Sequence, residues 1–149
     1  MIGLSSIPSF DLKRNYQRVK WEVLRALEGV LEGQHFILGP EVKAFEGEFA
    51  SYLGVDHAIG CASGSDALLL ALMAIGVGPG DEVITTPFTF FASTSCISRL
   101  GARAVYVDVE PDTYNMRMDM VMDAVTDKTK AVLPVHIFGQ MCPLEQIRG

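Results

Sequence analysis

The sequence predicts an α/β fold, a three-layer α/β/α arrangement in which helices cover both faces of a mainly parallel sheet. From about residue 57 onward, short apolar runs alternate with segments of helical periodicity, the pattern of strand–helix–strand units. Residues 104–109 and 129–135 are continuous apolar runs, as expected for strands buried on both faces. The chain reaches Gly149 inside what looks like the next helix, so we expect the sheet to be incomplete.

The individual elements follow from periodicity and from the residues that begin and end helices. Apolar positions repeating every three or four residues predict helices, Pro40 suits a first helical position, and Gly33 and Gly54 suit helix ends. The expected helices cover residues 13–31, 40–53, 65–75, 90–100 and 118–125. The expected strands cover residues 57–61, 82–86, 104–109 and 129–135. Helix 65–75 is apolar on almost all sides, so we expect it to be buried.

The same periodicity suggests two parts. We expect residues 1–35 to form an N-terminal arm with a helix, and residues 36–149 to form the first part of a larger domain.

Composition excludes several classes of protein. The chain is 49% hydrophobic and 20% charged, which fits a soluble globular domain, and its net charge of −6 offers no basic surface for nucleic acid or an anionic membrane. Its longest apolar run is too short to span a bilayer, and the start lacks the pattern of a signal peptide. Cys61, Cys96 and Cys142 suit neither a metal site nor a disulfide framework, so we expect buried free thiols in a cytoplasmic protein.

One candidate binding segment, residues 62–68, lies between a predicted strand and the apolar helix. Gly64 lets a ligand approach the backbone, while Ser65 and Asp66 open a helix whose free N–H groups favour an anion. The segment could therefore form a phosphate-binding cup. Ser and Asp also cap helices that bind nothing, and this alternative stays open. The glycine fingerprints of nucleotide-binding loops do not occur in the sequence.

A second candidate segment, residues 85–94, also follows a predicted strand. Pro87 forces an extended exit, and three phenylalanines follow it, two of them Phe88 and Phe90. An aromatic ring offers a stacking face to a flat ligand, although core packing would explain any one of these residues equally well. Together the two segments favour a phosphorylated aromatic cofactor at the carboxyl ends of the strands.

The order and spacing of short motifs resemble those of the DegT/DnrJ/StrS-type sugar aminotransferases. The resemblance covers nearly the whole chain from about Ile7. The matching motifs lie at residues 36–42, 63–68, 78–84, 87–90, 101–102, 107–109, 129–131, 134–136 and 139–140.

This resemblance implies the aspartate-aminotransferase fold and pyridoxal 5′-phosphate (PLP) as cofactor. It implies that Gly64, Ser65 and Asp66 hold the cofactor phosphate and that Phe90 stacks on the pyridine ring. His136 would face the same crevice, either with a role of its own or as a structural histidine. The expected reaction moves an amino group, commonly from glutamate, to a keto group of a nucleotide-linked sugar, and the expected assembly is a homodimer.

The resemblance also implies that the lysine that forms a Schiff base with PLP lies beyond Gly149. The five lysines of the chain do not match that position. We therefore expect no catalytic residue here, and a 149-residue chain that is inactive alone and binds PLP weakly or not at all. Two alternatives stay open: a PLP-dependent sugar dehydratase of the same fold, and a non-catalytic, truncated binding or regulatory module.

Overall fold

The computed structural model describes residues 10–146. Contacts within the chain form two compact units, one ending at Gly60 and one beginning at Cys61. The division into residues 1–35 and 36–149 concerns the complete fold and stays a prediction.

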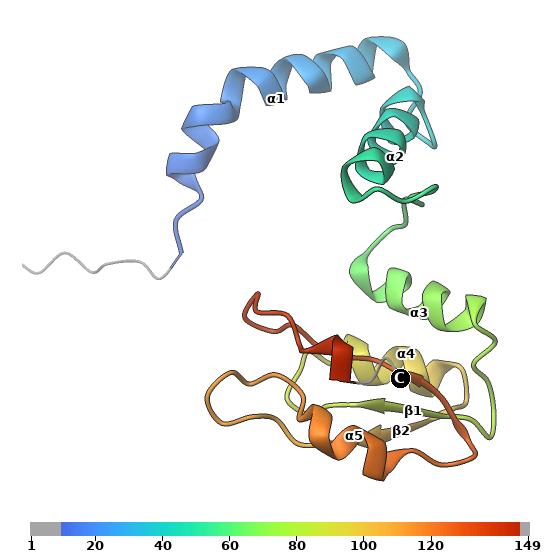
Figure 1. The fold of residues 1–149 in the computed structure, drawn as a ribbon. Helices are drawn as coiled ribbons and strands as arrows, with labels where there is room; N and C mark the ends of the chain where they lie inside the picture. The colour runs from blue at the N-terminus through green and yellow to red at the C-terminus, as the bar shows by residue number, and fades with distance from the viewer. Residues whose placement is uncertain (1–9, 147–149) are drawn as a thin grey trace, which may run out of the picture. The chain divides into compact units, whose positions relative to one another are not determined.

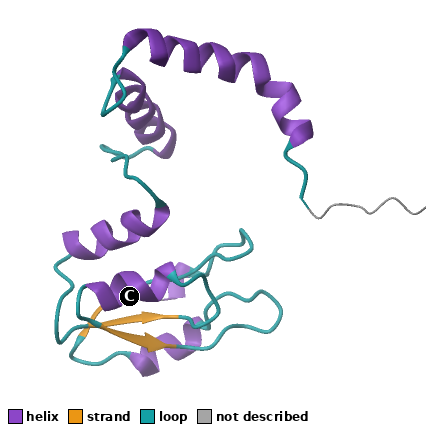
Figure 2. Cartoon of the chain, turned by 180° about the vertical axis from the view of Figure 1, so that it is seen from behind, coloured by secondary structure: helices purple, strands orange, loops and turns teal. Residues whose placement is uncertain are grey.

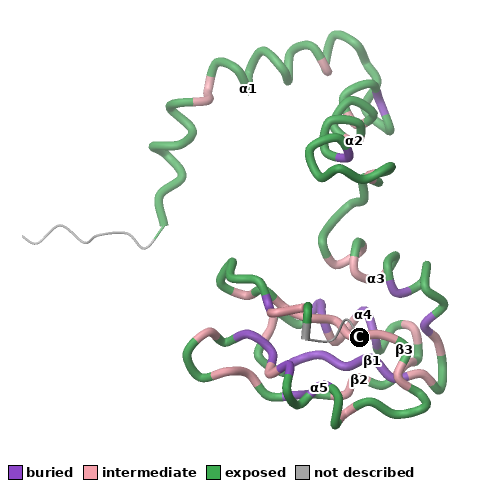
Figure 3. Tube along the Cα trace, in the orientation of Figure 1, coloured by how far each residue is buried: buried purple, intermediate pink, exposed green. Residues whose placement is uncertain are grey.

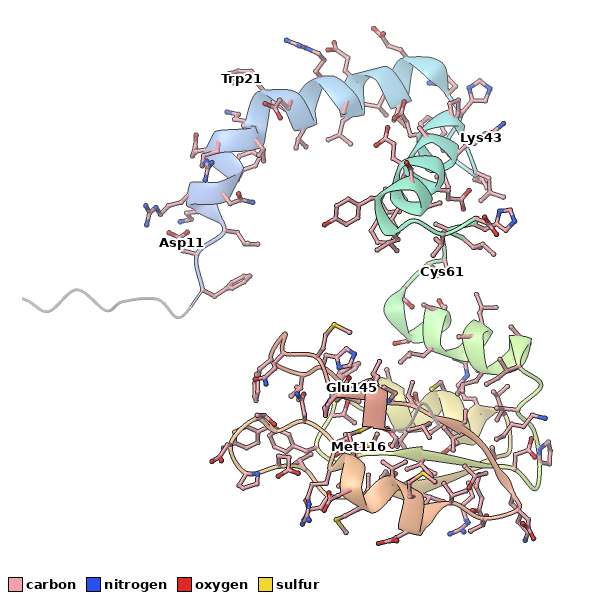
Figure 4. All side chains as sticks on the ribbon, in the orientation of Figure 1. Asp11, Trp21, Lys43, Cys61, Met116 and Glu145 are labelled. Carbon is pink, nitrogen blue, oxygen red and sulfur yellow. The ribbon has the colours of Figure 1, made fainter. Side chains whose placement is uncertain are left out.

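The described part of the first unit contains two helices, α1 (Lys13–Gly33) and α2 (Pro40–Leu53), close to the predicted bounds. Pro40 occupies the first turn of α2, and Gly54 ends it in the left-handed conformation, with φ of 67°. None of the residues of α1 is buried, and Trp21, labelled in Figure 4, is one of its exposed side chains.

The predicted strand over residues 57–61 was wrong. Figure 2 shows loop between α2 and the next helix, and the Gly60 N–H donates to Glu46 Oε1 at 2.7 Å. A strand needs a neighbour to take its backbone groups, and this segment pairs with no strand within residues 10–146.

The second unit is a parallel sheet with helices on both faces, which confirms the predicted fold class (Figure 1). Its strands pair in the order β2-β1-β3, so β1 is central and the crossovers run to either side of it. The strands are β1 (Glu82–Thr85), β2 (Arg103–Tyr106) and β3 (Thr129–Val132). The helices are α3 (Gly64–Ala74), α4 (Ala92–Arg99), α5 (Met118–Ala124) and the short 3-10 helix η1 (Leu144–Gln146).

Two adjacent residues of β1 divide the core into two layers. Val83 packs among residues of α3 and α4, whereas Ile84 faces the opposite way and packs among residues of α5 and the loop that enters it. Neither side chain is exposed at all. Figure 3 shows β1 as the buried centre of this unit. Alternation along one strand therefore produces the three layers.

Two expectations about burial were only partly met. Helix α3 buries one residue, Leu72, while Leu70 and Met73 are 50% and 54% exposed, because α4 and the sheet cover a single face of it. Cys96 and Cys142 are buried free thiols as predicted, but the free thiol of Cys61 is exposed. Burial raises the pKa of the Cys96 thiol.

Within residues 10–146, no helix combines the length and the apolar character needed to cross a bilayer. The same residues contain no group of His, Cys, Asp and Glu side chains placed to hold a metal ion.

Candidate functional site

The sheet brings the two candidate segments to one edge of the second unit. Helix α3 runs against the direction of β1, and α4 does the same after the turn that follows β1. Their N-termini therefore lie at the carboxyl end of β1, at the same end of the unit (Figure 1). Ligands of open α/β sheets bind at this edge. Gly64, Ser65, Asp66 and Phe90 therefore lie toward the same edge of the second unit.

Helix α3 begins one residue earlier than predicted, and Ser63 is its N-cap. The Ser63 hydroxyl accepts a hydrogen bond from the Asp66 N–H at 3.2 Å and donates to Asp66 Oδ2 at 3.0 Å. The Ala67 N–H donates to the Ser63 carbonyl at 2.9 Å. The Ser63 side chain therefore caps the helix, and the Asp66 amide is occupied.

Three donors at the start of α3 have no partner among residues 10–146. Within the described part of the chain, the N–H groups of Gly64 and Ser65 have no hydrogen-bond partner, and neither has the Ser65 hydroxyl. They lie at the positive end of the helix dipole. Of the three residues predicted to hold a phosphate, only Gly64 and Ser65 therefore have free amides. The Asp66 amide already donates to the Ser63 hydroxyl and orders the turn.

Among the residues that the structure describes, neither a contact nor the backbone conformation requires glycine at position 64. Its backbone is not left-handed, and a β-carbon built there meets no atom within 4 Å. Glycine at such a position leaves room for a ligand to approach the backbone closely. A phosphate group at the free amides of α3 would be such a ligand.

The aromatic segment lies between β1 and α4. Phe90 is 76% exposed, and its carbonyl accepts the Ser93 N–H at 3.1 Å. The Thr89 and Ser93 hydroxyls are 2.9 Å apart, which fixes the turn that presents Phe90. An exposed ring held on a fixed backbone is available for stacking.

These residues fit PLP in kind. Its phosphate needs several donors and a favourable dipole, which the start of α3 supplies, and its ring needs a flat partner, which Phe90 offers at the same edge. The fit concerns residue types and the edge they share.

Residues that the sequence reasoning missed lie in the neighbouring loops of this edge. Tyr114, between β2 and α5, stacks on Phe88 with ring centroids 5.3 Å apart, and Phe138, after β3, meets Tyr114 edge-on at 5.6 Å. His136 Nδ1 accepts the Cys142 N–H at 3.1 Å, which agrees with a structural role for this histidine.

The opposite edge of the sheet carries a polar network centred on Glu82. Its carboxylate accepts hydrogen bonds from Arg103 at 2.5 Å and from the Thr126 hydroxyl at 2.8 Å, and its N–H donates to the Lys128 carbonyl at 2.8 Å. The hydrogen bond from Arg103, followed by that from Thr126, lowers the pKa of Glu82. This network joins the amino ends of all three strands. Lys128 directly precedes β3 and Lys130 is its second residue, so both lie toward the edge away from the candidate site.

Known proteins resemble the chain along almost its whole length. The sequence model of the DegT/DnrJ/EryC1/StrS aminotransferase family matches residues 17–149. A "pleiotropic regulatory protein" of Geobacillus stearothermophilus is 50% identical over 95% of the chain. A UDP-2-acetamido-2-deoxy-3-oxo-D-glucuronate aminotransferase of Pseudomonas aeruginosa is 43% identical over 96%. The chain spans only 38% and 40% of the lengths of these two relatives.

Solved structures show the same similarity. Streptomyces venezuelae DesV, in complex with a ketimine intermediate, superposes with a TM-score of 0.91 at 42% identity, covering 95% of this chain and 38% of DesV. Bacillus subtilis NtdA, with bound cofactor PMP, gives a TM-score of 0.92 at 33% identity, covering 97% of this chain and 34% of NtdA. The chain therefore belongs to the DegT/DnrJ/EryC1/StrS aminotransferase family.

Proposed function

We propose that this chain is the N-terminal part of a PLP-dependent aminotransferase that transfers an amino group, from glutamate, to the keto group of a nucleotide-linked sugar. The observation that carries the proposal is the shared edge: free amides at the start of α3 and the exposed ring of Phe90 both lie at the carboxyl end of β1. The relatives named as nucleotide-sugar aminotransferases or transaminases, at 41–43% identity, support the substrate class.

The residues of the chain would hold the cofactor. The N–H groups of Gly64 and Ser65 and the Ser65 hydroxyl bind the phosphate, while the Ser63–Asp66 pair keeps the first turn of α3 in place. Phe90 covers one face of the ring. Bound PLP supplies an electron-withdrawing ring that stabilises negative charge at the carbon that bears the amino group.

We propose further that the Schiff-base lysine is not among residues 1–149, so that this chain alone is inactive. Lys128 and Lys130 support this, because one directly precedes β3 and the other is its second residue, toward the edge of the sheet away from the cofactor cup. Lys13, Lys20 and Lys43 lie on the helices of the first unit, with the Lys20 ammonium 5.1 Å from the centre of the Trp21 ring. Adding PLP to the isolated chain should give no turnover of glutamate and no Schiff-base absorbance. Either signal would overturn this part of the proposal.

The test of the cofactor site compares two neighbouring phenylalanines in the full-length enzyme. Phe90 and Phe91 are 76% and 75% exposed, so truncating either should cost little stability. Phe90→Ala should weaken PLP binding about 2- to 10-fold, the range expected from one aromatic pair, while Phe91→Ala should leave it unchanged. Equal effects of the two variants would contradict the assigned role of Phe90.

The reaction is tested by product analysis. The full-length enzyme, given PLP, glutamate and a keto nucleotide sugar, should release 2-oxoglutarate and an amino sugar in equal amounts. A dehydrated sugar without consumption of glutamate would instead identify the dehydratase of the same fold.

A regulatory role is the second candidate, favoured by the name of the relative at 50% identity. It predicts that the full-length protein lacks amino transfer with every keto nucleotide sugar offered. Turnover would exclude a purely regulatory protein.

We also propose that the full-length enzyme is a cytoplasmic homodimer. The exposed apolar side chains along α1, among them Trp21, Leu27 and Leu31 at 73%, 54% and 60% exposure, support association through this helix. Free cysteine thiols suit a reducing compartment. Light scattering should give twice the subunit mass, and a monomer at all concentrations would contradict the proposal.

A further inference from the structure

Three loops that leave the sheet at the candidate cofactor edge meet through one side chain. Phe88 follows β1, Tyr114 follows β2 and Phe138 follows β3. The Tyr114 ring stacks on Phe88 with an interplanar angle of 30° and receives Phe138 at 87°. The ring of Tyr114 therefore lies between the other two loops and contacts both.

The backbone of Tyr114 is held in an unfavourable conformation. Its φ is 58°, in the left-handed region that favours glycine. The loop imposes this: the Tyr114 N–H donates to the Glu110 carbonyl at 2.9 Å, and the Glu110 N–H donates to the Asn115 carbonyl at 2.8 Å. A bridge between Val109 and Met116, the latter labelled in Figure 4, closes the base of the loop. Strain kept in this way is often found at functional sites.

Asn115, the next residue, connects the same loop to the loop that follows β3. It is 4% exposed, and its side-chain amide donates to the Met141 carbonyl at 3.2 Å. The left-handed turn at Tyr114 thus lets two consecutive side chains join the loop to different neighbours. The buried Asn115 side chain binds the loop after β3, while the partly exposed Tyr114 ring contacts Phe88.

Phe88 connects this contact to the proposed cofactor site. It lies two residues before Phe90, and its N–H donates to the Thr86 hydroxyl at 3.3 Å, at the end of the buried strand β1. Through its contact with Phe88, the ring of Tyr114 therefore packs against the turn that contains Phe90.

We propose that Tyr114 is a positioning residue for the cofactor: through Phe88 it fixes the turn that holds Phe90 against the pyridine ring. The inference rests on the proposed function, because it assumes that PLP binds at this edge. The contact with Phe88 is made by the aromatic ring of Tyr114, and its phenolic hydroxyl has no hydrogen-bond partner among residues 10–146.

The test distinguishes the effect of the Tyr114 ring from that of its backbone conformation, using variants of the full-length enzyme loaded with PLP. Tyr114→Phe keeps the ring and should leave PLP affinity and the visible circular dichroism of the cofactor unchanged. Tyr114→Gly removes the ring but accepts the left-handed backbone, so the fold should persist. This variant should bind PLP about 2- to 10-fold more weakly, with reduced visible dichroism and a lower kcat at similar KM for glutamate.

Phe138→Ala is a second variant in case Tyr114→Gly does not fold. Phe138 is 67% exposed, so its loss should cost little stability, and it should reduce the visible dichroism of the cofactor relative to the unaltered enzyme. Unchanged dichroism and affinity in every folded ring-deficient variant would overturn the inference while leaving the proposed function standing. Failure of the unaltered enzyme and of Tyr114→Phe to bind PLP would overturn the proposed function, and this inference with it.

Discussion

Gly64→Ala should change stability and cofactor binding in opposite directions. The fold tolerates a methyl group at this position, because a β-carbon there meets no atom within 4 Å and the backbone is not left-handed. Gly64 is the first residue of α3, and alanine is the better helix former. Stability should therefore stay equal or rise, by at most about 1 kcal/mol.

Cofactor binding should weaken, because the new methyl group lies beside the Gly64 N–H. A methyl group here would crowd a phosphate group that approaches the first turn of α3 closely, and the hydrogen bond from the Gly64 N–H would lengthen or break. One hydrogen bond to a charged group contributes about 1.5–3 kcal/mol. Its loss corresponds to an affinity for PLP roughly 10- to 150-fold lower.

The assay is a titration of the full-length apoenzyme with PLP, followed by absorbance, alongside urea unfolding without cofactor. Gly78→Ala is the matched control: this glycine also has no atom within 4 Å of its β-carbon and no left-handed backbone. It lies in the turn before β1, and its N–H donates to Asp81 Oδ2 at 2.9 Å. Gly78→Ala should keep full affinity.

Two results would refute the reasoning. Equal PLP affinity of the Gly64 and Gly78 variants would mean that no ligand approaches the start of α3. Marked destabilisation of the Gly64 variant without cofactor would mean that the chain itself requires this glycine.

Three further predictions concern the scaffold, each measured by urea unfolding of the full-length protein. Ser63→Ala removes the N-cap bond to Asp66 and should destabilise by about 1 kcal/mol, whereas no loss would mean that the cap is not formed. Ile84→Ala truncates a fully buried side chain and should cost about 2–5 kcal/mol, far more than Leu70→Ala, whose side chain is half exposed. The pKa of Glu82 is below its ordinary value of 4.5, so its ionised form stabilises the fold above that pH, and this stability is lost as pH falls through the lowered value. Glu82→Gln should reduce the loss of unfolding free energy at acidic pH. An unchanged dependence of stability on pH would count against the network.

The predicted elements agree best where local residues determine the ends of helices. The bounds of α2 were predicted correctly because Pro40 and Gly54 act on their own backbone, whatever surrounds them. The start of α3 was misplaced by one residue, although the sequence contains the signal: a Ser three residues before an Asp is a capping pattern.

The errors concern contacts between distant segments. The apolar run at residues 57–61 has the composition of a strand, but composition does not supply a pairing partner. The contacts of Tyr114 with Phe88 and Phe138 join residues 26 and 24 positions apart (114 − 88 and 138 − 114), and no periodicity relates loops to one another. The candidate cup and Phe90 share one edge although the strand predicted before the cup does not form, because α3 and α4 both run against β1 and begin at its carboxyl end.

The most direct measurement is a crystal structure of the full-length enzyme with PLP bound. The account predicts phosphate oxygens about 2.7–3.2 Å from the amide nitrogens of Gly64 and Ser65, with the pyridine ring lying on Phe90. A cofactor whose phosphate is held elsewhere, with the first turn of α3 open to solvent, would contradict the central claim.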